Sequence, residues 1–179
     1  MPHSNLEMRA KYGRERRAKL KESNLCQSCS VTPLGNRKSR CESCHEKHLK
    51  DTYDRRLRRR EAGLCQNCER VALLNTNTCL EHWLKAMATD HLGNVKNWKL
   101  LLKKLEDQDY KCPYLGELLI PGVNINLDHI VPTSRGGSTT DINNLQWTSK
   151  LANFMKTYLT HEEFIEKCTI IASRFAISK

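Results

Sequence analysis

The sequence contains few aromatic residues and no long apolar run. Phe, Trp and Tyr account for 6% of its 179 residues, and hydrophobic residues for 39%. This small apolar content disfavours one large core and favours one or two domains built from small modules. No run approaches the length of a membrane span, and no amphipathic stretch resembles a lipid anchor. A function inside a membrane is therefore not expected.

The N-terminal stretch M-P-H-S-N-L-E lacks the apolar region of a secretory signal. We therefore expect a soluble, cytoplasmic protein. In a reducing compartment, the nine cysteines should be free thiols or metal ligands rather than disulfides. Their spacing along the chain decides between these two states.

Positive charge is in clear excess. The chain has 30 Lys and Arg against 20 Asp and Glu, which gives a formal net charge of +10. Cationic side chains displace counterions from phosphates, so DNA or RNA is the first expected partner. An acidic membrane surface is the alternative, but the sequence offers no segment that would anchor the protein there.

Two pairs of cysteines near the N-terminus have the spacing of a zinc site. L-C-Q-S-C supplies Cys26 and Cys29, and C-E-S-C supplies Cys41 and Cys44. Two C-x-x-C pairs joined by a short polar loop strongly indicate tetrahedral zinc bound by four thiolates. The plainer alternative is four small buried cysteines.

The same unit recurs later in the chain. G-L-C-Q-N-C supplies Cys65 and Cys68, and C-L-E-H supplies Cys79 and His82. Cys₄ and Cys₃His are both ordinary structural zinc sets, and a repeat of about forty residues is hard to obtain by chance. We therefore predict two structural Zn²⁺ ions, which would stabilise modules that have little apolar core.

A basic segment precedes each zinc unit, and both segments have helix-forming composition. A solvated, charged helix is one interpretation, and contact with DNA phosphates is the one favoured here. The residues expected to contact DNA, two of them further along the chain, are Arg14, Arg16, Arg17, Arg55, Arg56, Arg58, Arg59, Arg60, Arg135 and Lys156.

Hydrophobic periodicity and turn residues predict the remaining elements. Thr160 followed by Glu163 predicts a capping box at the start of the last helix, whose apolar stripe is interpreted as core. Predicted helices cover residues 5–22, 46–60, 82–91, 95–107, a stretch beginning near 149, and 161–177, with strands near 118 and at 123–127.

Residues 127–156 carry a second group of polar side chains. Asp128 and His129 directly follow a short apolar run, and Pro132 and Gly136 then favour a loop before a helical stretch with Asn153. One Asp and one Asn can suffice for Mg²⁺ beside a substrate phosphate. A neutral imidazole can take a proton from an attacking water. This combination suits phosphodiester cleavage.

The motifs D-H-I-V-P, G-G, N-N-L-Q and N-x-x-K follow one another in this order. The chain thereby resembles the HNH, or ββα-metal, endonuclease family over about residues 110–156. The resemblance implies that His129 is the general base and that Asp128 and Asn153 bind a catalytic Mg²⁺ or Mn²⁺. It also implies that Asn144 braces the loop and orients His129, and that Lys156 contacts phosphate. The expected products carry 5′-phosphate and 3′-hydroxyl ends.

The resemblance also suggests the fold class, which is α+β. A small ββα-metal module with packing helices is expected at residues 93–179. It would follow two small zinc-knuckle or ribbon modules with basic helices at residues 1–92, divided into about 1–50 and 51–92.

The chain departs from this family at one point. Many members hold a structural zinc with four cysteines, but the matching positions here are Cys112, Leu115, Ser149 and Ala152. That zinc should be absent. Apolar packing is expected to replace it, by Tyr114, Leu115, Leu118, Leu145, Trp147 and Leu151.

Three functions remain open at this stage. The small size and tandem zinc units resemble homing endonucleases of phages and bacteria, acting as a monomer or homodimer. A type II restriction endonuclease of the HNH class is the first alternative. A non-catalytic, zinc-dependent nucleic-acid-binding protein is the second.

Overall fold

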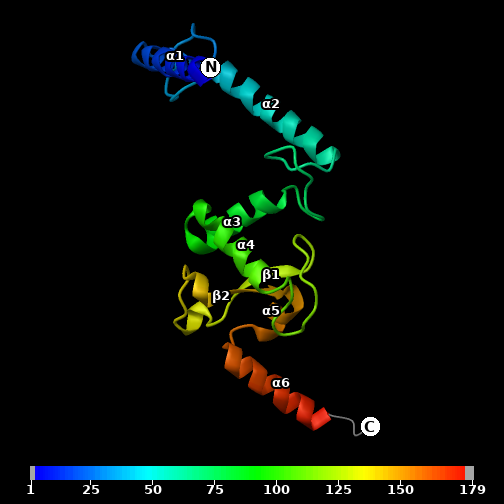
Figure 1. The fold of residues 1–179 in the computed structure, drawn as a ribbon. Coiled ribbons are helices and arrows are strands. Elements are labelled where there is room, and N and C mark those ends of the chain that lie inside the picture. The colour runs from blue at the N-terminus through cyan, green and yellow to red at the C-terminus, as the bar shows by residue number, and fades with distance from the viewer. Residues whose placement is uncertain (1–2, 176–179) are drawn as a thin grey trace. The chain divides into compact units, whose positions relative to one another are not determined.

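A computed structural model describes residues 3–175 of the chain. Within these residues the fold is α+β, with six α-helices and one antiparallel pair of strands (Figure 1). The chain forms two compact units, Met1–Arg58 and Arg59–Lys179. The boundary predicted between residues 92 and 93 separates zinc-binding repeats from a nuclease module, and it stays a prediction. No helix among the described residues is both long and apolar enough to cross a membrane.

The first unit contains helix α1 (His3–Glu22), a cysteine-bearing loop and most of helix α2 (Glu42–Glu61). Both helices confirm predicted ones, although α2 begins four residues before the predicted start at 46. Its small core consists of Cys26, Leu34 and Cys41, with Cys44 packed against them. So little apolar surface stabilises the unit only weakly without a further cross-link.

The second unit has a core to which helices and strands both contribute. Helices α3 (Leu80–Leu92) and α4 (Trp98–Asp107) pack against each other, joined by the short 3₁₀ helix η1 (Val95–Asn97), and α4 also contacts strand β2 (Leu145–Ser149) (Figure 1). Gly93 ends α3 in the left-handed conformation, with φ 62°.

Trp147 is the central side chain of this core and is fully buried. Its ring stacks on Trp83 with 5.2 Å between centroids, and its indole nitrogen donates to the carbonyl of Leu101 at 2.9 Å. The side chain of Gln108 accepts from the backbone N–H of Trp147 and donates to its carbonyl. The outer edge of β2 is therefore hydrogen-bonded by a side chain in place of a third strand.

Strand β1 (Ile125–His129) pairs antiparallel with β2, and Leu127 lies opposite Trp147. The prediction of a strand at 123–127 is confirmed with a shift of two residues. The predicted strand near Leu118 is wrong, because only an isolated bridge from Lys111 to Leu118 forms there. The second strand is β2, which was not predicted although Leu145 and Trp147 alternate with Gln146 and Thr148; all five of its residues are buried, the polar ones included.

Helix α5 (Lys150–Lys156) follows β2 without a loop. Ser149 ends the strand and caps the helix, since its hydroxyl accepts from the N–H of Ala152 at 3.1 Å. The backbone therefore runs strand, loop, strand, helix. In the loop, two single turns of 3₁₀ helix, η2 (Thr133–Arg135) and η3 (Ile142–Asn144), follow β1.

Helix α6 (His161–Phe175) begins with the predicted capping box. The N–H of Thr160 donates to the Glu163 carboxylate at 2.9 Å, and the N–H of Glu163 donates to the Thr160 hydroxyl at 3.3 Å. Its apolar stripe, however, is not core as predicted. Phe164 is buried, but Ile171 and Phe175 are 59% and 76% exposed. Cys168 is partly buried, and residues 176–177 of the predicted helix lie outside the described part of the chain.

The packing expected to replace the family's zinc is only partly present. Leu145 and Trp147 are fully buried, and Tyr114 packs against the core. Leu115, Leu118 and Leu151 are between 44% and 59% exposed. Of the four positions that match zinc ligands in the resembled family, Cys112, Ser149 and Ala152 are buried and Leu115 is exposed.

The loop after β1 closes so tightly that Gly137 has no room for a side chain. A Cβ on Gly137 would lie 1.9 Å from the carbonyl oxygen of Val131 and 2.8 Å from the side-chain nitrogen of Asn144. We predict that Gly137→Ala destabilises the second unit by roughly 1–3 kcal/mol, as forced overpacking does. Thermal unfolding followed by tryptophan fluorescence measures this directly, because Trp83, Trp98 and Trp147 all belong to that unit.

Gly13→Ala is the matched control. Gly13 lies within α1, where an added Cβ would meet only the flexible end of Arg17 at 3.5 Å. This change should leave the tryptophan-monitored transition unchanged. An unchanged transition for Gly137→Ala as well would contradict the tight loop closure.

Candidate functional sites

The first zinc group consists of Cys26, Cys29, Cys41 and Cys44, whose sulfur atoms all lie within 4.8 Å of one another. The sulfurs of Cys29 and Cys41 are 3.9 Å apart. Two sulfurs bound to one tetrahedral zinc at about 2.3 Å each would be about 3.8 Å apart. The four thiols therefore form a group that could bind one Zn²⁺, as predicted.

The backbone around this group favours a thiolate. Burial by itself raises the pKa of the Cys26 thiol, but hydrogen bonds from the backbone of Cys29, Cys41 and Ser28 together lower it to about 6. In contrast, the side-chain hydrogen bond with Cys41, followed by burial, raises the pKa of Cys44 to about 12. Without a cation, the thiolates of the group repel one another, so a divalent metal ion would stabilise the folded loop.

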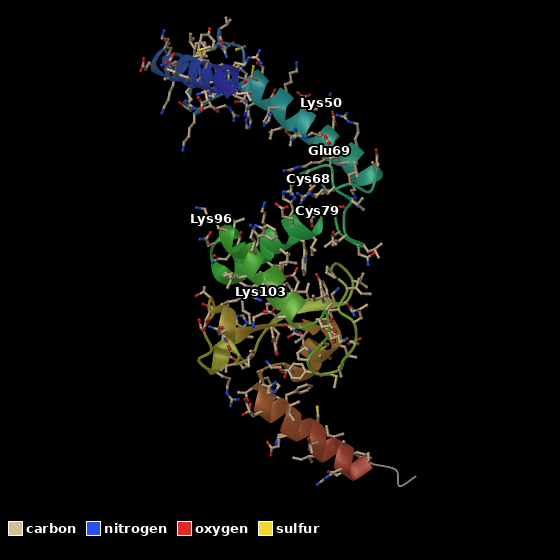
Figure 2. The ribbon with its side chains drawn as sticks, in the orientation of Figure 1. Lys50, Cys68, Glu69, Cys79, Lys96 and Lys103 are labelled. Carbon is tan, nitrogen blue, oxygen red and sulfur yellow. The ribbon has the colours of Figure 1, made fainter. Side chains whose placement is uncertain are left out.

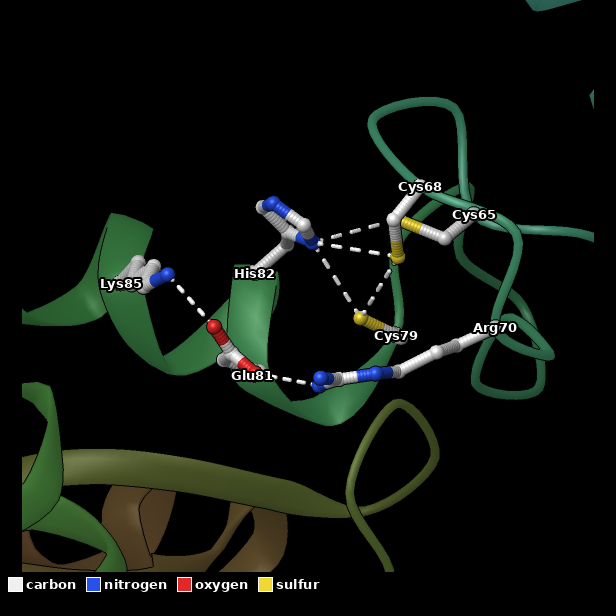
Figure 3. Close-up of polar contacts among 7 residues, drawn as sticks. All are labelled: Cys65, Cys68, Arg70, Cys79, Glu81, His82 and Lys85. Atoms are coloured by element: carbon white, nitrogen blue, oxygen red, sulfur yellow. Dashed lines mark hydrogen bonds and ion pairs between the residues drawn. The ribbon is translucent and has the colours of Figure 1, made fainter. Parts of the chain in front are cut away.

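The second zinc group consists of Cys65, Cys68, Cys79 and His82 (Figure 3). The Nδ1 atom of His82 lies 3.3–3.6 Å from the three sulfurs, and the sulfurs of Cys68 and Cys79 are 3.7 Å apart. A sulfur and a nitrogen bound to one tetrahedral zinc would be about 3.6 Å apart. His82 therefore replaces the fourth cysteine of the first group through Nδ1.

An ion-pair cluster fixes the helix that carries His82. Glu81 binds both Arg70, from the zinc loop, and Lys85, one turn further along α3 (Figure 3). The hydrogen bonds from Lys85 and then Arg70 lower the pKa of Glu81 to about 2. The cluster is partly solvent-exposed, so its contribution to stability is small, but it orients the first turn of α3 next to the metal ligands.

The third group of polar side chains lies where β1, the loop and α5 meet, and Lys156 is at its centre. Lys156 is fully buried. Its ammonium lies 3.1 Å from Oδ2 of Asp128 and donates to the carbonyl of His129 at 2.8 Å. A buried cation is stable only when paired, so these contacts hold the end of α5 against the end of β1.

Asn144 fastens the loop between the strands. Its side-chain oxygen accepts from the N–H of Val131 at 2.9 Å, while its nitrogen donates to the carbonyls of Val131 and Ser138. Its backbone carbonyl accepts from the N–H of Ile130 at 2.8 Å. The carboxamide is therefore fully used in bracing the loop, and it positions His129 only through the backbone that follows β1.

The ring of His129 faces the ring of His91, from the last turn of α3, with 6.0 Å between centroids. The Nε2 atom of His129 is buried and has no hydrogen-bond partner among the described residues. Burial, followed by the nearby charge of His129, lowers the pKa of His91 and favours its neutral form. His91 was not predicted as a site residue, since it lies in a different helix and belongs to no motif.

Asp128 and Asn153 provide oxygen atoms that suit a hard divalent cation. The contacts that Asp128 makes with Lys156 and Gln146 both involve Oδ2, which leaves Oδ1 available. Asn153 is half-buried on α5, which packs against β1, and its carboxamide makes no hydrogen bond within residues 3–175.

A chain of hydrogen bonds connects Asp128 to the start of α6. Gln146 donates to Asp128 at 3.2 Å and to the hydroxyl of Tyr114 at 2.7 Å, and that hydroxyl lies 3.2 Å from Nδ1 of His161. Burial, only partly offset by the bond from Gln146, raises the pKa of Tyr114. Sequence analysis had assigned Tyr114 to packing alone, and Gln146 had only its place in N-N-L-Q as a signal.

The residues expected to contact DNA have different surroundings in the structure. Arg59 donates to the carbonyl of Gln66 at 3.3 Å, Arg135 forms an ion pair with Glu163 at 2.8 Å, and Lys156 is buried as described. The others expose their side chains and lie on α1 and α2, namely Arg14, Arg16, Arg17, Arg55, Arg56, Arg58 and Arg60.

No protein-family model matches the chain, and no curated protein matches it.

The zinc groups lead to a stoichiometric prediction. The purified chain should hold two zinc ions, and Cys29→Ser or Cys68→Ser should each leave one, because three ligands bind zinc far more weakly than four. Bound zinc should also fall as the pH is lowered, since protons compete for the thiolates. Elemental analysis of dialysed protein gives the count.

Cys168→Ser is the matched control, because Cys168 belongs to neither group and lies on α6. This variant should retain both zinc ions. Three zinc ions in the wild-type protein, or none, would contradict the assignment of ligands.

Proposed function

We propose that the protein is a metal-dependent DNA endonuclease of the HNH, or ββα-metal, type. One observation carries the proposal: Asp128 and His129 at the end of a strand, a loop braced by Asn144, and a helix whose Lys156 binds back to both. The strand, strand, helix order is that of the family which the motifs resemble. The two groups of potential zinc ligands belong to the part of the chain that would bind DNA.

The proposed reaction is hydrolysis of one phosphodiester bond. His129 accepts a proton from the attacking water, whose oxygen forms the new bond to phosphorus. The bond to the 3′ oxygen breaks, and this oxygen leaves as a 3′-hydroxyl after gaining a proton, so the phosphate stays on the 5′ end. Mg²⁺ or Mn²⁺, held by Asp128 and Asn153, would neutralise charge on the scissile phosphate and the leaving oxygen.

Lys156 and Gln146 fix the carboxylate of Asp128 from the protein side. Because both contact Oδ2, the orientation of Oδ1 is set before a cation arrives. Asn144 and Gly137 hold the loop so that the His129 ring keeps its place beside His91. These residues act as positioning groups.

The first test replaces the proposed base. His129→Ala should lower the rate of Mg²⁺-dependent cleavage of double-stranded DNA by about 10²–10⁴-fold, the usual contribution of a general base. DNA affinity measured without divalent metal should stay unchanged. His48→Ala is the control, because His48 is exposed on α2 and belongs to neither zinc group.

Each outcome of this test decides between the functions. Unchanged cleavage by His129→Ala would show that the base is wrongly assigned. Binding without any cleavage by the wild-type protein would instead favour a non-catalytic, zinc-dependent DNA-binding protein.

Within the endonucleases, we propose a homing endonuclease over a type II restriction enzyme. The two zinc modules differ in their ligands, Cys₄ against Cys₃His. Two unequal modules in one chain suit a long target without two-fold symmetry, whereas restriction enzymes read short palindromes.

Digestion of a random-sequence DNA library, followed by sequencing of the ends, tests this choice. We expect a long, degenerate and asymmetric target. A short palindrome at every cut would instead identify a restriction endonuclease.

A further inference from the structure

The two zinc modules share one hydrogen-bonded framework, with a shift of 39 residues that takes Cys26 to Cys65. The N–H of Leu25 donates to the carbonyl of Leu20 at 2.8 Å, and that of Leu64 donates to the carbonyl of Arg59 at 2.8 Å. Both modules therefore connect the end of the preceding helix to the metal loop in the same way.

Further pairs of bonds match in the same register. Asn24 and Gly63 both have left-handed backbones, with φ 52° and 67°, and donate to Lys21 and Arg60 respectively. The third residue of each C-x-x-C repeats the pattern, since the N–H groups of Ser28 and Asn67 both donate to a cysteine sulfur at 3.4 Å. These backbone hydrogen bonds therefore determine which residues of the two helices are equivalent, independently of any sequence alignment.

In this register the positive charges of the two helices coincide. Five positions carry Lys or Arg in both helices, and the pairs are Lys11 and Lys50, Arg16 and Arg55, Arg17 and Arg56, Lys19 and Arg58, and Lys21 and Arg60. We name these ten residues the matched basic set. The position of Arg14 is not matched, because its equivalent is Tyr53.

Every member of the matched basic set is exposed, and Figure 2 labels Lys50 on α2. None of them forms an ion pair with a carboxylate within the described part of the chain. Arg16 donates to the hydroxyl of Ser30 in the first zinc loop, whereas the other nine side chains make no hydrogen bond within the described residues. The folding of the modules therefore does not require the charges of those nine residues. Ten like charges at repeated positions raise the free energy of the isolated protein, so their repetition points to a polyanion as partner.

Arg59 shows the contrast with a structural arginine. Arg59 occupies the position equivalent to Leu20 of the first module, and its side chain is 21% exposed. Its guanidinium lies 3.7 Å from the carboxylate of Glu69 and donates to the carbonyl of Gln66. Its guanidinium is thus used to hold the second zinc loop. Figure 2 labels Glu69 and Cys68, which are neighbours in the second zinc loop.

We propose that each zinc module has an equivalent phosphate-contact surface, formed by those members of the matched basic set that lie on one side of its helix, and that both surfaces bind the backbone of double-stranded DNA. This rests on the proposed function and states which residues carry it. Arg59 is a positioning residue for the second zinc loop and makes no contact with DNA. Because the surfaces are equivalent, the two helices contribute equally to the salt dependence of binding.

The test measures the affinity of the full chain for a random-sequence DNA duplex, without divalent metal, as a function of salt. Each lost phosphate contact reduces the slope of log K against log salt by about 0.9. Arg17→Gln and Arg56→Gln should each reduce it by this amount, and the double variant by about 1.8. Glutamine removes the charge and keeps helix propensity.

Two variants serve as controls. Arg174→Gln removes an exposed arginine of α6 that forms no ion pair among the described residues, and should leave the slope unchanged. Arg59→Gln should also leave the slope unchanged, while it lowers the temperature at which the zinc of the second module is released.

The outcomes separate this proposal from the endonuclease function. The proposal for the matched basic set alone would be overturned if the wild-type protein binds DNA but Arg17→Gln and Arg56→Gln leave the salt slope unchanged. It would also be overturned if only one of these two variants reduces the slope. Reduced slopes without Mg²⁺-dependent cleavage would overturn the endonuclease alone. No binding to duplex DNA, or binding to duplex RNA only, would overturn both.

Discussion

The arrangement of the proposed cleavage site depends on one buried cation. Lys156 has no access to water, so its ammonium must find oxygen atoms inside the protein. It finds them at Asp128 and at the carbonyl of His129, the last two residues of β1. A single side chain therefore fixes the distance between strand and helix and orients the carboxylate beside it. Asn144 holds the loop in place through hydrogen bonds alone.

Around the two cysteine groups the limiting quantity is apolar area. The first unit buries little besides sulfur and one leucine, Leu34, which cannot offset the conformational entropy of its loop. A metal ion bound by four ligands would supply the missing free energy and also cancel the repulsion between the thiolates. The loops can therefore be polar and short, because their fold does not depend on hydrophobic burial.

Local patterns predicted local structure well and long-range packing poorly. Cysteine spacing identified both ligand groups, because a metal imposes its own geometry on nearby residues. The box of Thr160 and Glu163 fixed the start of α6 for a similar reason. Strand β2 was missed although its apolar and polar residues alternate, because the pattern spans only five residues, and His91 reaches His129 only through the packing of α3. The exposed stripe of α6 shows that helical periodicity identifies an apolar face but not what covers it.

The two parts of the proposed function place opposite demands on the protein. A cleavage site needs few residues held rigidly, and the buried ion pair and braced loop meet this need within about thirty residues. Binding of a duplex by its phosphates needs many exposed charges that the fold itself does not use. Such binding weakens steeply with salt, whereas proton transfer inside the site does not. At high ionic strength the overall rate would therefore follow binding, and at low ionic strength it would follow the chemistry or the release of product.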